Sequence, residues 1–197
     1  MSLATAELLP EQLKQKLPDF MYKIQELSDK LKIDLTQFQA DHIALRINEP
    51  ELAQLAHQAW LAEGKEISNA MINGRPIIVI TFNQPLKVLS WEIECLELPY
   101  PAEGKIYPEQ TWEHVEFVIP SNAQTADEFA AELTQRFPQL AEQWDTLAQQ
   151  GIKVKLSSPK GEGERLNNPT VAFKHQGVCI KLHPHSLKAI VESEQSA

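Results

Sequence analysis

The chain has 197 residues, of which 43% are hydrophobic and 23% charged, as in a globular protein that buries a core, and its net charge is −9 at pH 7. This acidic balance disfavours nucleic acid and anionic lipid as partners, because both require a basic face. No apolar run is long enough for a membrane span and two cysteines are no disulfide framework, so we expect a cytoplasmic protein.

Residues 1–40 have a helical pattern. Apolar residues recur at three- and four-residue steps from Leu13 to Leu31, which predicts an amphipathic helical region. Pro18 and Asp19 suit a helix start, so the pattern predicts two helices, the second beginning there. We expect this segment to be an N-terminal helical extension that packs on the outside of the remaining chain and has no chemistry of its own.

Residues 41–108 have the pattern of one βαβββ module followed by a connector. A strand over 41–47 alternates polar and apolar residues, and residues 51–63 show the spacing of an amphipathic helix. Asn73 and Gly74 form a strong hairpin signal. The remaining strands are expected at 65–72, 75–82 and 86–98, before a connector rich in Pro and Gly.

Residues 109–197 repeat this order of elements. A strand is expected at 112–120 and helices at 125–136 and 140–149. Three more strands are expected at 152–156, 169–174 and 178–183, and a closing helix at 186–194. The fold class is therefore predicted to be α+β, with two βαβββ modules behind a helical extension.

A histidine opens the first strand of each module. His42 follows Asp41, His114 follows Glu113, and each histidine precedes a β-branched residue. A lone histidine at a strand start is more often structural than functional. Two histidines at matching positions of a duplicated half-domain favour a shared site, so we expect them to meet.

Glu97 adds a third candidate from the last strand of the first module. By alternation it shares a strand face with Ile93 and Cys95, where burying an unpaired carboxylate would be costly. A metal ion would supply the missing partner. Together with His42 and His114, this glutamate favours a metal site.

Six stretches spread over nearly the whole chain carry a family resemblance: ADHIALR (40–46), MINGRP (71–76), LPYP (98–101), WEH (112–114), SSPKGE (157–162) and IKLHP (180–184). They resemble the YecM family, whose members are expected to bind metal, within the vicinal oxygen chelate superfamily. The resemblance implies two βαβββ modules whose curved sheets close around one cleft. It also implies metal ligands on the first and fourth strands of each module.

By position, the resemblance assigns the first-strand ligands to His42 and His114 and the fourth-strand glutamate to Glu97. The second module departs from the pattern, because Lys181 stands where its glutamate is expected and a charged ammonium cannot ligate a cation. We therefore expect three protein ligands, with water or substrate completing the shell and His183 as the reserve fourth ligand. Nitrogen and oxygen ligands admit Zn, Ni, Co, Mn or Fe(II).

Two residues near these ligands are candidates for catalysis. Lys181, if desolvated beside a cation, is expected to have a lowered pKa and to serve as a base. Glu116 shares the strand face of His114 and either pairs with Lys181 or Arg46 or takes part in catalysis. The loop over 157–168 is either a solvated excursion or a substrate lid.

Three functions are compatible with this site. The leading one is a metal-dependent lyase, isomerase or epimerase that acts on a small oxygen-chelating metabolite. Two histidines and one carboxylate also form the ligand set of non-haem Fe(II) dioxygenases. A non-catalytic small-molecule binding module is the third, because fold alone does not fix function. We expect a monomer or homodimer, and nothing in the sequence names the substrate.

Overall fold

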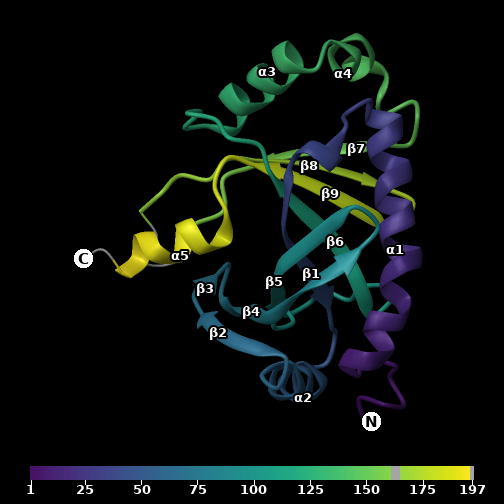
Figure 1. Cartoon of the computed structure of the whole chain (residues 1–197), viewed down its shortest axis with the longest axis vertical. Helices are drawn as coiled ribbons and strands as arrows, with labels where there is room; N and C mark the ends of the chain where they lie inside the picture. The colour runs from purple at the N-terminus through teal and green to yellow at the C-terminus, as the bar shows by residue number, and fades with distance from the viewer. Residues whose placement is uncertain (161–164, 196–197) are drawn as a thin grey trace.

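The computed structural model describes residues 1–160 and 165–195, so the proposed lid over 157–168 lies partly outside the described residues. The chain forms a mixed α+β fold in which one curved, open sheet is flanked by helices (Figure 1). The order of strand, helix and further strands occurs twice. This confirms the predicted fold class. The domain limits after residues 40 and 108 stay a prediction, because strands from both modules join a single sheet.

The elements of the first module follow the helix α1 (Pro10–Leu31) and the 3-10 turn η1 (Leu35–Gln37). They are β1 (Gln39–Arg46), α2 (Pro50–Trp60), β2 (Gly64–Ser68), β3 (Met71–Ile72), β4 (Arg75–Val88) and β5 (Trp91–Pro99). The second module consists of β6 (Thr111–Val118), α3 (Ala126–Arg136), α4 (Pro138–Gln143), η2 (Trp144–Thr146), β7 (Lys153–Ser157), β8 (Thr170–His175) and β9 (Val178–His183), with α5 (Leu187–Gln195) at the end.

The first strands of the two modules lie side by side in the middle of the sheet. The strand order is β2-β4-β5-β1-β6-β9-β8-β7, with β3 paired to β4. β1 pairs antiparallel with β6, while β5 and β9 pair parallel with β1 and β6 respectively. The last strand of each module therefore flanks the first strand of the same module, and the four strands expected to carry the site are adjacent.

One hydrophobic core, to which α1, α2, α3 and α4 contribute, lies against one face of the sheet. Ile43 and Val115 belong to this core, and because side chains alternate along a strand, His42 and His114 point to the opposite face. α1 runs along strands of both modules (Figure 1). The indole Nε1 of Trp112 donates a hydrogen bond of 2.8 Å to the carbonyl oxygen of Leu13 on this helix.

The prediction of two N-terminal helices was wrong, because α1 is continuous from Pro10 to Leu31. Pro18 lies within it on the exposed side, while Leu17 and Met21 continue the buried stripe on either side. An interior proline costs a helix about 3 kcal/mol, and burial of each large apolar side chain returns about 1.5–3 kcal/mol. The long stripe therefore outweighs the proline.

The predicted break between the third and fourth strands was also wrong. β4 continues to Val88, and its register against β5 shifts between Thr81 and Leu86. This irregularity accommodates Pro85, which has no N–H for a regular ladder. The chain turns instead at Leu89, whose φ of 52° is left-handed, and the predicted strand over 65–72 is divided into β2 and β3.

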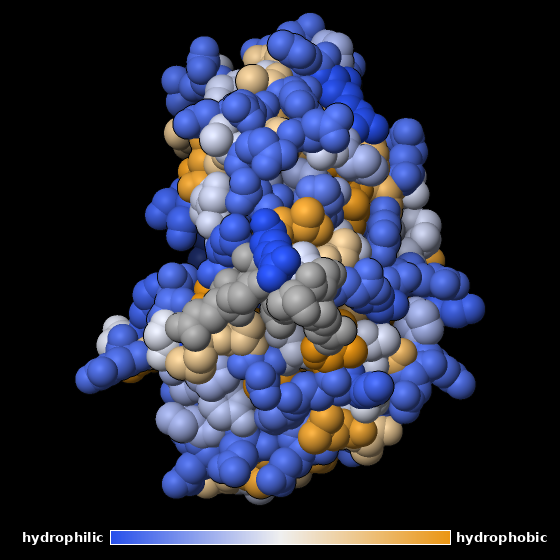
Figure 2. Space-filling view, turned by 90° about the vertical axis from the view of Figure 1, so that its left-hand side faces the viewer, coloured by the Kyte–Doolittle hydropathy of each residue, from blue (hydrophilic) through white to orange (hydrophobic). Residues whose placement is uncertain are grey.

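Among the described residues, no helix is both long and apolar enough to cross a bilayer. Figure 2 shows the face that bears α5, where hydrophilic residues predominate and hydrophobic ones form separate patches.

Gly64 lies where β2 approaches β4 closely, so a substitution at this position can test the packing of the two strands. A Cβ atom at this position would lie 2.3 Å from the carbonyl oxygen of Thr81, and backbone cannot move aside as a flexible side chain does. We expect Gly64→Ala to lower the free energy of unfolding by about 2 kcal/mol, measured by urea denaturation. The exposed neighbour Lys65, changed to Ala, should alter it by less than about 0.5 kcal/mol. Equal stability of the two variants would contradict this interpretation.

Candidate metal centre

Two β-bulges in the central strand pair, β1 and β6, change the direction of side chains at the site. In the β1–β6 ladder His42 lies opposite Glu116 and Ala44 opposite His114, while Asp41 and Glu113 are skipped by the register. Neighbouring residues of a regular strand point to opposite faces, but a bulge can turn both to one face. Each acidic residue therefore lies beside the histidine that comes next in sequence.

The bulged carboxylates hold the imidazole rings through Nδ1. Asp41 Oδ2 is 2.9 Å from His42 Nδ1, and the carboxylate of Glu113 makes a short contact with His114 Nδ1. A proton shared with the carboxylate at Nδ1 leaves the Nε2 lone pair free to face the other way. Carboxylate-held imidazoles of this kind are the usual support of metal-binding histidines.

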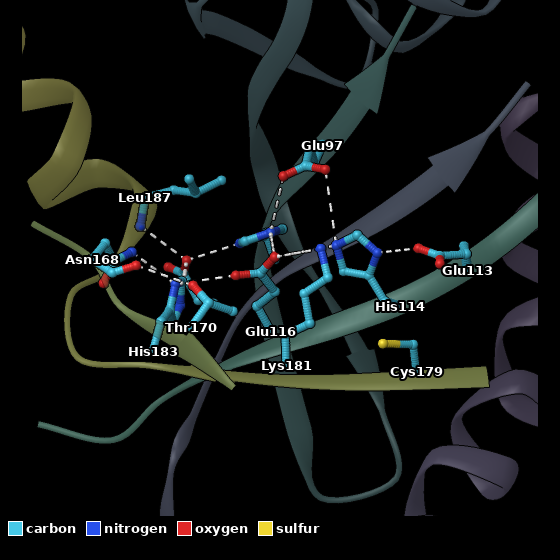
Figure 3. Close-up of polar contacts among 12 residues, drawn as sticks. Glu97, Glu113, His114, Glu116, Asn168, Thr170, Cys179, Lys181, His183 and Leu187 are labelled. Carbon is cyan, nitrogen blue, oxygen red and sulfur yellow. Dashed lines mark hydrogen bonds and ion pairs between the residues drawn. The ribbon is translucent and has the colours of Figure 1, made fainter. Parts of the chain in front are cut away.

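The free Nε2 atoms of both rings face two glutamates, and we call these four residues the His/Glu cluster: His42, Glu97, His114 and Glu116. Figure 3 labels Glu97, His114 and Glu116. His42 Nε2 is 3.3 Å from a carboxylate oxygen of Glu97 and 3.3 Å from one of Glu116. His114 Nε2 is 3.2 Å from Glu116 Oε1 and 3.8 Å from Glu97 Oε1. One possible ligand atom from each residue lies within 4.8 Å of all the others.

A divalent cation fits the His/Glu cluster. The Nε2 atoms of His42 and His114 are buried and have no hydrogen-bond partner in the described part of the chain. Their contacts with the carboxylates have ion-pair distances without hydrogen-bond geometry. Buried polar atoms are rarely left in this state, and a metal ion between them would satisfy both nitrogens and both carboxylates.

Sequence reasoning did not identify Glu116 as a possible ligand. The register shows why it can be one: Glu97 lies beside Ala44 across the β1–β5 ladder, whereas Lys181 lies beside Glu116 across the β6–β9 ladder. The carboxylate that is missing from β9 is thus supplied by β6. The position of Glu116, two residues after His114 on the same strand face, was the sequence signal.

The two ion-pair partners considered for Glu116 lie in different places. Lys181 Nζ is 3.3 Å from Glu116 Oε1, as expected. Arg46 instead pairs with Glu113 at 3.2 Å and lies 3.9 Å from Glu97. Lys181 thus contacts the His/Glu cluster through Glu116. Arg46 lies on the Nδ1 side of His114, where it pairs with Glu113.

His183 lies on the other side of Glu116 from His114. Its Nδ1 is 3.1 Å from Glu116 Oε2, and its Nε2 is 3.4 Å from Asp41 Oδ2. With Asp41 and His42 it forms a second close group of possible ligand atoms. It is therefore brought near the centre without joining Glu97 and His114, and its role as reserve ligand stays a prediction.

The C-terminal segment supports this second group. Asp41 Oδ2 accepts a hydrogen bond of 2.9 Å from the backbone N–H of Leu187, at the start of α5 (Figure 3). Asn168 Nδ2 donates to His183 Nδ1 at 2.9 Å, and Asn168 Oδ1 accepts from the His185 N–H. Sequence reasoning missed Asp41, Glu113 and Asn168, although the acidic residue before each histidine was visible.

Opposite charges control the ionisation of the metal-free His/Glu cluster. Burial tends to raise the pKa of Glu97, but His42, His114 and Lys181 outweigh it and lower that pKa to about 2. Burial likewise opposes His42 and Lys181 at Glu116, whose pKa lies well below its ordinary value. The pKa of His42 is raised well above 6.5, because Glu116 and Asp41 outweigh its burial. Metal uptake would therefore displace a proton.

The lowered pKa expected for Lys181 is not found. Burial lowers the pKa of this ammonium, but the carboxylates of Glu116 and Glu97 raise it by more, so that the net shift is upward. Cys95 and Cys179 are buried thiols, and burial raises the pKa of Cys179 to about 12. Both cysteines fit the role of small core residues.

Comparison with known proteins gives a consistent match. The YecM protein family matches residues 10–194. The chain is 41% identical over 181 residues to Protein YecM of Escherichia coli (strain K12), with 92% of each chain covered. A structural genomics structure of Protein EC4020 has a TM-score of 0.77 and 34% identity, covering 94% of this chain and 92% of that one. A methylmalonyl-CoA epimerase from Mycobacterium tuberculosis matches with 14% identity and a TM-score of 0.42 over 76% of this chain and 89% of its own, too distant for any argument.

The ionised groups of the metal-free centre predict how the free energy of unfolding of the protein depends on pH. The lowered pKa of Glu97 contributes stability that is present above pH 4.5 and is lost as the pH falls toward about 2. The raised pKa of His42 contributes stability that is present below pH 6.5 and is lost as the pH rises through the folded-state pKa. We expect metal-free protein to lose up to about 1.4 kcal/mol per pH unit above pH 6.5.

Urea denaturation of protein stripped with a chelating resin measures this effect between about pH 6 and pH 8, below the titration of free thiols. His42→Gln, which cannot carry a proton charge, should show a flatter profile over the same range. A wild-type stability that is constant across this range would contradict the expectation.

Proposed function

The chain belongs to the YecM family, as its sequence resemblance predicts, and on this premise we propose that the His/Glu cluster binds one divalent metal ion. We further propose that the protein is a metal-dependent enzyme of the lyase, isomerase or epimerase class that acts on a small oxygen-chelating metabolite. Family membership names no reaction, so the side chains of the centre must indicate the chemistry.

The observation that carries the metal proposal is the pair of buried Nε2 atoms of His42 and His114, which face carboxylates but have no hydrogen-bond partner in the described part of the chain. Each ring is oriented from behind by a carboxylate, and each nitrogen faces Glu97 and Glu116. In a pair of histidines with a purely structural role, these nitrogens would instead form hydrogen bonds with the protein. This arrangement supports a cation as the natural partner.

The surrounding residues divide the chemical tasks. A divalent ion held by the His/Glu cluster would supply a Lewis acid for an oxygen of the chelating metabolite. Lys181 keeps its positive charge, so it is suited to stabilising negative charge on the substrate rather than to accepting a proton. Glu116 is ionised, and in this proposal its carboxylate completes the metal shell beside Glu97.

The Fe(II) dioxygenase alternative uses two histidines, one carboxylate and open coordination positions. It requires Glu116 to stay with Lys181 rather than complete the shell, which the 3.3 Å contact between them permits. Iron in the purified protein would favour this alternative, and another divalent metal would favour the leading proposal.

Elemental analysis tests the metal proposal directly. Protein purified without added metal should contain close to one divalent ion per chain, and His114→Gln should lose it. Removal of a supporting group alone costs about 10–100-fold in metal affinity, so loss of a ligand nitrogen should cost at least as much. His175→Gln is the matched control, because His175 lies in the β8–β9 hairpin, away from the centre, and contacts the carbonyl oxygen of Gly151.

Circular dichroism of the variants separates loss of metal from loss of fold. Wild-type protein that stays metal-free after dialysis against zinc, nickel, manganese and iron salts would rule out the metal centre. It would leave the non-catalytic binding module as the remaining function.

Lys181 should weaken metal binding by its charge. Its Nζ lies 3.3 Å from a carboxylate oxygen that would otherwise be free for the ion. We expect Lys181→Met to bind metal at least about fivefold more tightly, measured by competition with a fluorescent chelator. Lys188→Met, which removes a charge paired with Glu94 outside the His/Glu cluster, should leave the affinity within about twofold. Weaker metal binding in Lys181→Met would contradict the assigned role.

A further inference from the structure

A cavity of about 490 Å³ lies behind the metal centre, where the ends of β1 and β6 approach α1 and the β8–β9 hairpin. This volume is in the range of small-molecule sites. Phe20, Trp112 and Val178 give it apolar walls, and Tyr107 from the connector contributes an aromatic ring. The cavity does not include the His/Glu cluster, so it is a separate feature of the molecule.

The charge around this cavity is nearly balanced, in contrast to the acidic protein as a whole. Four basic side chains line it, against three acidic ones. Lys16 is paired with Glu7, which lies outside the cavity. Lys23 and Lys174 have no ion-pair partner among the described residues and are exposed, and the same is true of the acidic Asp19 and Glu109. Two cations at the cavity are therefore available to a ligand.

Arg46 is a largely buried charged residue in the cavity wall, and several contacts hold its side chain in place. Its side chain is only 11% exposed and stacks on the Tyr107 ring at 5.3 Å. It donates from Nη1 to the Leu45 carbonyl oxygen at 3.1 Å and pairs through Nη2 with Glu113. Five N–H donors belong to a guanidinium, so these contacts and the 3.9 Å approach to Glu97 use only part of its capacity. The Nε has no partner among the described residues, but it is buried.

The cavity is linked to the metal centre by one carboxylate. Glu113 lines the cavity, pairs with Arg46 and contacts Nδ1 of His114. A molecule bound against Arg46 would thus lie one ion pair away from a proposed metal ligand, on the side of the ring that faces away from the His/Glu cluster.

We propose that this cavity, the Arg46 pocket, binds a small metabolite that has an anionic oxygen group and a short apolar body. Arg46, Lys23 and Lys174 receive the carboxylate or phosphate group, because a guanidinium and ammonium groups are the side chains that pair with oxyanions. Phe20, Trp112 and Val178 receive the apolar body. The binding of this anion goes beyond the proposed metal function and does not depend on it.

Isothermal titration of metal-free protein at low salt tests the pocket without the metal centre. The probes are 3-phenylpropionate, phenyl phosphate and the neutral amide 3-phenylpropanamide. We expect saturable binding of at least one anion, and about tenfold weaker binding of the amide, because a charged hydrogen bond is roughly twice as strong as a neutral one. The stronger of the two anions identifies the source as carboxylate or phosphate.

Charge reversal locates the bound anion. The double variant Lys23→Glu and Lys174→Glu should weaken anion binding about tenfold, since each exposed pair contributes up to about 1 kcal/mol. The control double variant Lys32→Glu and Lys65→Glu makes the same change of net charge at exposed positions outside the pocket. It should leave the affinity within about twofold.

Three results would overturn the Arg46 pocket: no saturable binding of either anion in the millimolar range, an amide that binds as well as the anions, or equal losses in the two double variants. Anion binding that appears only after metal is added, and that survives Lys23→Glu and Lys174→Glu, would place the anion on the metal and also refute the pocket. A failure of metal binding alone would leave the pocket intact.

Discussion

The antiparallel pairing of β1 with β6 is the constraint on which the whole site depends. It places His42 opposite Glu116 and Ala44 opposite His114, so that two imidazoles from different modules reach one point. A slip of one residue in this ladder would send each side chain to the other face and into the apolar core. The small Ala44 leaves room beside Glu97 for the second ring. The fold therefore fixes the centre through backbone hydrogen bonds rather than through contacts between the charged groups themselves.

The buried carboxylates of the centre are neutralised by neighbouring protein groups rather than by solvent. Glu97, Glu116 and Asp41 are ionised despite their burial, and their partners are His42, Lys181 and a backbone N–H at the start of α5. Leaving a buried carboxylate without such partners would cost several kcal/mol, so each group depends on the others. The same balance explains why Lys181 is a charged neighbour of the centre and not a neutral base.

Strand alternation and the repeat of the two modules are visible in the sequence, so local pattern was enough to predict the fold class. It was also enough to select His42, His114 and Glu97 as candidates that the structure brings together. Asp41 and Glu113 could not be assigned, because a β-bulge depends on the partner strand and has no reliable local signal. Glu116 was placed on the correct face, yet its contact with both imidazoles depends on cross-strand register. The helix start predicted at Pro18 was wrong for a similar reason. Burial of the apolar stripe of α1 outweighed the local preference of proline for a helix start.

The difference between the flanking strands gives the centre a direction. β5 presents the carboxylate of Glu97 on one side of the central pair, and β9 presents the ammonium of Lys181 on the other. A molecule bound between them would meet unlike charges at its two ends and would lose both contacts if it turned end for end. The order of elements is the same in both modules, yet the charge at the centre changes sign from one flanking strand to the other.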